Sequence, residues 1–381
     1  MTLEVKHEEL SELIGCYYKT KLPLMVIGTF GIGKSQGVKE KAIELSKEKN
    51  KEFINWNETS KDKKLEVYNN AEKYFNFVDI RLSEFDASDI KGLPELQASE
   101  KFKEWLIWRV PFFAKLIENP ESDGILFFDE INLAPPLIQS SCYKIIHDRI
   151  INDGRVGEDW LIMGAGNTDE DRAYTHDLAP PLRDRFGEVK LLIPTTQDWI
   201  DKYAIPRGIN SMIIGFLSFK TGSLYRVDFD DKQKFTTPRG WERISKLIEK
   251  NPTGKDYNKL SILAKSGIGE GIAQEFVAFC KISEQIKLPE IIANPKRLKE
   301  IKEINVKWFI NTALAEQYKD KKVKFEKIVD FSRVMDEIGD VELVAYLWKL
   351  CSGMSKNFKK DFIDKIDEKD ELITKYAKYI C

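Results

Sequence analysis

A glycine-rich loop near the start of the chain constrains its fold more than any other feature. Residues 28–35 read GTFGIGKS and fit the pattern G-x-x-x-x-G-K-S/T. The apolar run 24–27 precedes the loop and reads as a buried strand, and helical periodicity over 36–47 follows it. A strand, such a loop and a helix in this order are typical of a site that wraps a polyphosphate.

The residue types of this loop suit a nucleoside triphosphate. Glycines let backbone N–H groups face phosphate oxygens, and the start of the helix adds positive potential. Lys34 is predicted to reach the β- and γ-phosphates, and Ser35 to ligate Mg²⁺. The predicted nucleotide-binding residues are Gly28, Thr29, Phe30, Gly31, Ile32, Gly33, Lys34, Ser35 and Gln36.

Carboxylates after a later strand supply the other half of such a site. The apolar run 124–128 leads into Asp129 and Glu130. Asp129 is predicted to hold the Mg²⁺ hydration shell, and Glu130 to polarise the attacking water, which distinguishes a hydrolase from a nucleotide switch without a base. The alternative is that the pair caps the following helix. Asn167, after a further strand, is predicted to orient the water or contact the γ-phosphate, and its alternative role is a turn residue.

Two arginines, Arg183 and Arg185, lie on a short helix predicted to begin at Pro180. Because they are distant from the loop in sequence, they are candidates for a guanidinium supplied across a subunit interface to stabilise transition-state charge. The alternative is a local salt bridge with Asp184 or Glu188.

A further arginine, Arg239, occupies the first turn of a helix predicted to begin after Thr237. A cation in a first turn opposes the helix dipole. An anionic partner such as a γ-phosphate would explain its place, and the alternative is a tolerated surface charge.

Strands alternate with helices over the first half of the chain, which predicts an α/β fold with a parallel five-stranded sheet between helices. The expected strands are 24–27, 75–82, 124–129, 160–165 and 189–193. The polar, lysine-rich segment 49–70 reads as an excursion over the surface.

Helical spacing dominates the second half of the chain. We therefore expect a nucleotide-binding core over 1–196, a helical domain over 197–292 and a helical C-terminal extension over 293–381. Within the core, Asp153 and Gly154 predict a hairpin turn.

The charge balance argues against nucleic acid or a membrane surface as the partner. The 381 residues include 60 Lys and Arg against 62 Asp and Glu, a net charge of -2. No run approaches the roughly 18 apolar residues of a membrane helix, and the N-terminus lacks the apolar segment of a secretion signal. The five cysteines are isolated, which speaks against a disulfide framework or zinc site. We expect a soluble, cytoplasmic protein.

Several segments together resemble the AAA+ ATPases, and in particular the MoxR-type, dynein- and midasin-related subfamily. The likeness extends over about residues 8 to 285 and includes the glycine-rich loop and the Asp129-Glu130 pair. The segments that match this subfamily are Asp86–Pro94, Ala165–Asn167 with Asp171–Ala173, Thr237–Glu242 and Gly269–Phe276. The chain departs from the pattern at Gly240, where a bulkier residue is common.

The resemblance implies a role for each candidate residue. Residues 28–35 would be the Walker A loop, Asp129 and Glu130 the Walker B pair, and Asn167 sensor 1. Arg185 would be the arginine finger, with Arg183 sharing or replacing it, and Arg239 would be sensor 2. The helix-2 insert would lie at about 83–105 and the hairpin before sensor 1 at 150–158, both facing a central pore.

The resemblance also implies an assembly and an activity. Such proteins hydrolyse ATP with Mg²⁺ in hexameric rings whose active sites lie between subunits. They act as chaperone-like remodellers of a client protein, often beside a partner that carries a von Willebrand factor A domain. We therefore expect ATP and Mg²⁺ as cofactors, a homo-oligomer, and these two kinds of protein partner.

Two other readings compete with a protein remodeller. A nucleic-acid translocating motor would need a basic pore, but the insert and the hairpin carry balanced charges. Salt-sensitive DNA binding would favour the motor. An ATP-gated scaffold with little turnover is the other alternative, and the candidate base Glu130 argues against it.

Overall fold

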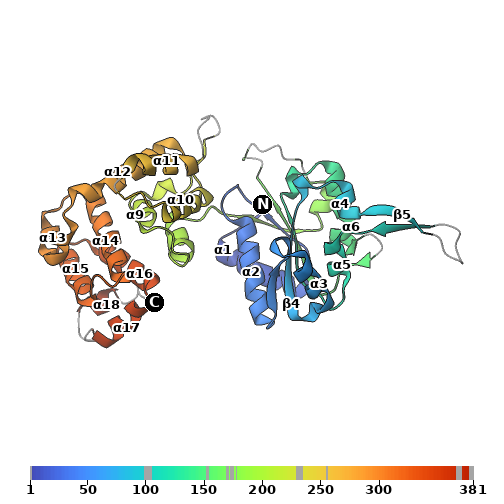
Figure 1. Cartoon of the computed structure of the whole chain (residues 1–381), viewed down its shortest axis with the longest axis horizontal. Coiled ribbons are helices and arrows are strands. Elements are labelled where there is room, and N and C mark those ends of the chain that lie inside the picture. The colour runs from blue at the N-terminus through green and yellow to red at the C-terminus, as the bar shows by residue number, and fades with distance from the viewer. Residues whose placement is uncertain are drawn as a thin grey trace. The chain divides into compact units, whose positions relative to one another are not determined.

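The chain divides into two units, residues 1–193 and 194–381 (Figure 1). The computed structural model describes residues 2–97, 105–151, 154–168, 171, 176, 178–228, 235–254, 256–365 and 371–376. The first unit contains the glycine-rich loop and the sheet, and the described part of the second is built of helices.

One parallel sheet forms the centre of the first unit. Among the described residues its strands are β1 (Leu3–Val5), β2 (Leu24–Ile27), β3 (Glu52–Asn55), β4 (Tyr74–Arg81), β7 (Asp123–Asp129), β10 (Trp160–Gly166) and β11 (Gly187–Leu191). Their order is β1-β11-β2-β10-β7-β4-β3, and every neighbouring pair is parallel. The predicted α/β class with a parallel sheet is confirmed.

The predicted number of five strands is wrong, because the sheet has a further strand at each edge. β1 and β3 are three and four residues long, and each fully buries a single side chain, Val5 and Ile54. A strand that buries one side chain has neither an apolar run nor a clear alternation. Its sequence pattern therefore does not reveal it.

Helices cover both faces of the sheet (Figure 1). α1 (His7–Thr20) and α2 (Lys34–Glu48) lie on one face, and α5 (Phe112–Glu118) and α6 (Pro136–Asp148) lie on the other. β7 runs between these layers with all seven residues buried. Because side chains alternate along a strand, β7 directs Phe127 to the α2 face, where it stacks with Phe77, and Phe128 to the opposite core.

The segment 49–70 is part of this fold, so the prediction of a surface excursion is wrong. It contains β3, a 3-10 turn at Trp56–Glu58 and α3 (Lys61–Asn69), and β3 pairs with β4. Trp56 and Val67 are 4% and 0% exposed. The few apolar residues of this lysine-rich segment occupy the buried positions, while its average polarity suggested a surface loop.

Among the described residues, two antiparallel hairpins extend from the first unit. β5 (Leu93–Gln97) and β6 (Trp105–Arg109) follow α4 (Ala87–Lys91) and project outward (Figure 1). They overlap the range expected for the helix-2 insert, of which 98–104 lie outside the described residues. β8 (Ile150–Ile151) and β9 (Gly154–Arg155) pair within the expected hairpin, of which 152 and 153 lie outside the description.

The second unit packs its helices around one core. Its described α-helices are α8 (Thr196–Trp199), α9 (Ser211–Phe219), α10 (Pro238–Lys250), α11 (Tyr257–Gly267), α12 (Glu270–Gln285), α13 (Leu288–Ala293), α14 (Ile304–Lys319), α15 (Phe325–Glu337), α16 (Val341–Met354), α17 (Lys356–Lys365) and α18 (Glu371–Tyr376). A single cluster of buried side chains includes Phe276, before the expected boundary at 292, and Trp348, after it. Within the described ranges, no helix is both long and apolar enough to cross a membrane.

A buried ion cluster stabilises the edge of the sheet where β7 begins. The Asp123 side chain is 1% exposed and pairs with Lys49 and Lys51 at 2.6 and 3.2 Å, and Tyr18 donates its hydroxyl to the same carboxylate. Removing one partner of a buried pair leaves uncompensated charge behind.

We expect Asp123→Asn to lower the free energy of unfolding by about 3 kcal/mol. Urea unfolding of the full chain measures the change, with Asp159→Asn as the control because that carboxylate is 57% exposed. Equal stability of the two variants would contradict the role given to the Asp123 cluster.

Candidate functional site

The glycine-rich loop joins the carboxyl end of β2 to the first residue of α2. Gly31 and Gly33 have φ angles of 75° and 98°, a region that favours glycine because it has no Cβ. His7 of α1 contacts the loop: its ring Nε2 donates to the carbonyl oxygen of Ile32 at 2.8 Å. The His7 contact carries no sequence signal, since it joins residues from separate elements.

Lys34 and Asn167, which are distant in sequence, meet beside the loop. The Lys34 ammonium donates to Asn167 Oδ1 at 3.0 Å and to the carbonyl oxygens of Gly28 and Thr29. Lys34 is 9% exposed, so these partners compensate the burial of its charge. A phosphate oxygen in the loop would compete with these oxygens for the ammonium.

Ser35 and Asp129 form a second contact between separate segments. Ser35 Oγ donates to Asp129 Oδ2 at 2.6 Å, and the backbone N–H of Glu130 donates to Asp129 Oδ1 at 2.9 Å. Mg²⁺ on a nucleotide takes few protein oxygens and keeps several waters. The part of the chain that the structure describes holds no group of three His, Cys, Asp or Glu side chains arranged for a metal. The hydroxyl of Ser35 and the carboxylate of Asp129 are oxygen donors of the kind that Mg²⁺ takes when it binds together with a nucleotide.

Glu130 has a left-handed backbone conformation, with φ at 56°. Its Oε2 accepts a hydrogen bond from Ser83 Oγ at 2.8 Å. Ser83 belongs to the 3-10 turn Leu82–Glu84, which directly follows β4, the neighbour of β7. Ser83 thus joins the candidate site, and its place just after a strand is the one sequence signal that could have indicated it.

Asn132 fixes the position of Asn167. Its Oδ1 accepts from the backbone N–H of Asn167 at 3.0 Å, and its Nδ2 donates to the carbonyl oxygen of the same residue at 2.8 Å. Both side-chain groups of Asn132 are therefore used to hold the backbone at the end of β10.

The loop after β10 also contacts the glycine-rich loop. Asp171 is 7% exposed and accepts from the backbone N–H of Thr168 at 3.2 Å. The hydroxyl of Thr29 donates to the same carboxylate. Arg172 and Ala173, which belong to the same matching segment, lie outside the described residues.

Two carboxylates, those of Asp79 and Asp129, lie at the carboxyl ends of the neighbouring strands β4 and β7. Asp79 lies on the same face of the sheet as Asp129, because Arg81 pairs with Asp129 and alternate residues share a face. Burial, and then the negative charge of Asp129, raises the pKa of Asp79 to about 6. A divalent cation at Asp129 would relieve this repulsion.

The two candidate finger arginines have different surroundings. Arg183 donates from Nε and Nη2 to the carboxylate of Glu188, at 2.8 Å each, so the local salt bridge named as the alternative is present. Arg185, just beyond α7 (Pro180–Arg183), is exposed, and its guanidinium makes no hydrogen bond or ion pair with the described residues. Arg185 is the more available of the two.

Arg239 lies in the first turn of α10 and is exposed. Thr237 caps this helix, accepting from the backbone N–H of Gly240 at 3.2 Å. A Cβ built on Gly240 would lie 2.7 Å from the carbonyl oxygen of Gly267, so the close approach of α10 and α11 requires glycine there. This explains the departure from the subfamily pattern. The contact of Arg239 with a phosphate stays a prediction.

Comparison with known proteins gives structural likeness alone. No family model and no curated protein matches the chain. The structure of NtrX from Brucella abortus in complex with ADP is 15% identical over 63% of this chain and 49% of its own, with a TM-score of 0.31. A RuvB mutant from Thermotoga maritima is 15% identical over 76% of this chain and 75% of its own, with a TM-score of 0.30. Likeness at this level assigns no activity.

Proposed function

We propose that the chain is an Mg²⁺-dependent ATPase of the AAA+ type. The observation that carries the proposal is the 2.6 Å contact between Ser35 and Asp129. It joins the hydroxyl after the loop lysine to the carboxylate that ends β7, and these are the two oxygens suited to Mg²⁺ on a triphosphate. Glu130, the next residue, supplies a base for hydrolysis.

Each group in the site has a role in this reaction. The backbone N–H groups of the glycine-rich loop bind the phosphates, and Lys34 exchanges its carbonyl partners for the β- and γ-phosphates. Mg²⁺, when bound, neutralises phosphate charge. Asn167 orients the attacking water, and Glu130 takes its proton.

Phosphate release from ATP tests this proposal. The parent protein is expected to release phosphate with Mg²⁺ and to stop when EDTA removes the metal. Lys34→Ala is expected to lose ATP binding, because its ammonium is the cation within the loop. Release that continues in Lys34→Ala or in EDTA would contradict the proposed site.

The contact between Ser83 and Glu130 is expected to restrain hydrolysis. While Ser83 donates to the carboxylate, it holds the base and weakens its attraction for the proton of water. Ser83→Ala should raise the rate of phosphate release about five-fold, the effect of one hydrogen bond worth about 1 kcal/mol.

Steady-state phosphate release at saturating ATP measures this effect. Ser140→Ala is the control, since that hydroxyl bonds the backbone of Pro136 within α6, away from the base. A rate for Ser83→Ala at or below that of the parent would show that Ser83 does not restrain Glu130.

The assembly is part of the same proposal. The guanidinium of Arg185 is exposed and has no hydrogen bond or ion pair with the described residues. This supports a role as an arginine finger that contacts the nucleotide bound to a neighbouring copy. By resemblance to the MoxR-type proteins, the ring is a hexamer that remodels a client protein in the cytoplasm, beside a partner with a von Willebrand factor A domain.

A further inference from the structure

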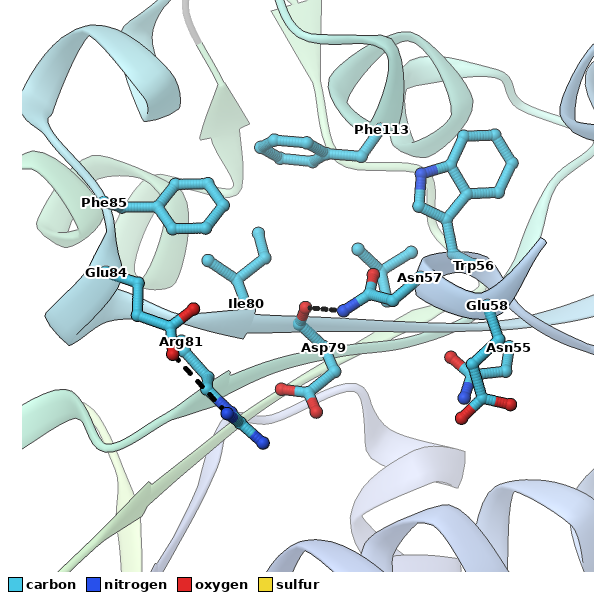
Figure 2. Close-up of a pocket in the computed structure, with 11 residues that line it drawn as sticks. Asn55, Trp56, Asn57, Glu58, Asp79, Ile80, Arg81, Glu84, Phe85 and Phe113 are labelled. Atoms are coloured by element: carbon cyan, nitrogen blue, oxygen red, sulfur yellow. Dashed lines mark hydrogen bonds and ion pairs between the residues drawn. The ribbon is translucent and has the colours of Figure 1, made fainter. Parts of the chain in front are cut away.

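A cavity of about 490 Å³ opens past the end of β3, beside residues 78–81 of β4 (Figure 2). Its volume is within the range of about 300–1,000 Å³ that holds small organic ligands. The turn Trp56–Glu58 forms part of its wall, and this turn belongs to the segment 49–70, which the proposed ATPase mechanism does not use. The cavity is therefore a candidate for a second site.

Two polar side chains that line the cavity have buried acceptor oxygens without a donor. Asn55 is aligned with Phe77 of β4, and alternate residues of a strand share a face, so Asn55 and Asp79 lie on the same face of the sheet. Asn55 Oδ1 and Asp79 Oδ1 are both buried, and neither accepts a hydrogen bond from the described residues. Because a buried acceptor without a donor is unfavourable, a ligand that brings N–H donors would gain free energy here.

The cations around Asp79 are engaged with other carboxylates. The positive charges of Arg81 and Lys39 act on Asp79. However, Arg81 Nη1 lies 3.5 Å from Glu84 Oε1, and Lys39 Nζ lies 3.1 Å from Glu58 Oε1. Asp79 has no ion pair with the described residues. Since carboxylates away from water are normally paired, this cavity offers a place for a cation from outside the chain.

Another wall of the cavity is apolar. Figure 2 shows Phe85 and Phe113 on the side of β4 opposite to the carboxylate of Asp79, with Ile80 beside them. Phe85 and Phe113 are only partly buried, and both pack against the core of the first unit. A carbon group of a ligand would remove more of these two rings from water.

A metal ion fits this cavity less well than an organic cation. The described residues hold no group of three His, Cys, Asp or Glu side chains arranged for a metal. Mg²⁺ is held by one or two carboxylates when phosphate oxygens complete its ligands, and Ca²⁺ takes six to eight oxygens. An ammonium group has only three N–H donors to satisfy, and the carboxylate of Asp79 and the amide oxygen of Asn55 are acceptors for them.

We propose that this cavity binds an organic cation in which a short carbon chain joins an ammonium group to a small apolar group. The ammonium donates to Asp79 and Asn55, and the apolar group packs against Phe85 and Phe113. The chain between them passes the edge of β4, which separates the two walls. An anion is excluded by the charge of Asp79. This binding does not depend on the proposed ATPase activity.

Titration of the intact protein with phenethylammonium tests the site. Phenethyl alcohol has the same ring and chain without the charge, and phenylacetate has the ring with a negative charge. In ¹H–¹⁵N spectra, the eight tryptophans give indole signals, and Trp56→Phe identifies that of Trp56, which lines the cavity. The indole signals of the other tryptophans are the internal control.

Phenethylammonium is expected to shift the Trp56 signal in a saturable way, with a Kd of about 1 mM, and phenylacetate to leave it in place. The alcohol should bind about ten-fold more weakly, because it lacks the charge. No shift with phenethylammonium up to about 10 mM overturns the site. Equal binding of the alcohol overturns the role of the charge. Displacement of the amine by MgCl₂ without nucleotide overturns the organic cation in favour of a metal.

Variants of the polar wall test the assignment of the acceptors. Asp79→Asn should weaken phenethylammonium binding about ten-fold, because it removes the charge and keeps the size of the side chain. Asn55→Leu should weaken it several-fold, because it removes the amide oxygen. Glu72→Gln is the matched control, since that glutamate is exposed and does not line the cavity. Binding that is the same in Asp79→Asn or in Asn55→Leu as in Glu72→Gln overturns the proposed contact with that residue.

Discussion

Glu130→Gln is expected to lower ATP hydrolysis by about 100-fold or more while ATP still binds. The glutamine keeps the size of the side chain, so Ser35, Asp129 and the loop are left intact. It removes the carboxylate that takes the proton from water, and general-base catalysis typically contributes about 10²–10⁴ in rate.

The test pairs phosphate release with equilibrium binding of ATP. Glu84→Gln is a matched control, because that glutamate lies on the neighbouring turn and is 66% exposed. Hydrolysis by Glu130→Gln at the parent's rate would mean that another group is the base. Loss of ATP binding together with hydrolysis would mean that Glu130 has a role in the structure of the site.

Arg185→Ala is expected to lower hydrolysis by about 10³-fold, the lower end of the effect of a guanidinium that stabilises a phosphoryl transition state. The guanidinium of Arg185 has no hydrogen bond or ion pair with the described residues that the variant could lose. Its removal should therefore leave the free energy of unfolding almost unchanged.

Arg183→Ala is the matched control for this variant. The guanidinium of Arg183 pairs with Glu188, and the Arg183 side chain is 61% exposed, so solvent screens this salt bridge and it contributes little to stability. We expect a small change in its rate. A larger loss in Arg183→Ala than in Arg185→Ala would reverse the assignment of the finger.

The main strands and the loop could be predicted because their signals are local. β2, β7 and β10 are buried on both faces and read as apolar runs, and the loop's glycines and Lys34 are contiguous. β1 and β3 could not be predicted, because each fully buries only one side chain at a sheet edge. The burial of Trp56 could not be predicted either, because the segment around it in the sequence is rich in lysine.

The candidate site was predictable as far as each residue followed a strand or a glycine-rich loop. Asp129, Glu130 and Asn167 all stand at the carboxyl ends of neighbouring strands, and parallel topology gathers these ends at one edge. His7 and Asn132 act through side-chain bonds to the backbone of other elements. Such contacts depend on tertiary packing and leave no pattern in the sequence.

Gly240 also has a role that depends on tertiary packing. In sequence it is only a poor helix former at the start of α10, and its reason appears once α11 is in place. A side chain there would meet the carbonyl oxygen of Gly267. A glycine that allows two helices to pack closely therefore cannot be explained from the sequence alone.

The central claim is that ATP is hydrolysed at a site shared between copies of this chain. The ATPase rate per subunit against protein concentration tests it most directly, with parent and Arg185→Ala mixed in varying ratio. We expect the rate per subunit to rise with concentration and to fall disproportionately as the variant is added. A rate that is independent of concentration and unaffected by Arg185→Ala would mean a monomeric enzyme or switch, and would contradict the proposed ring.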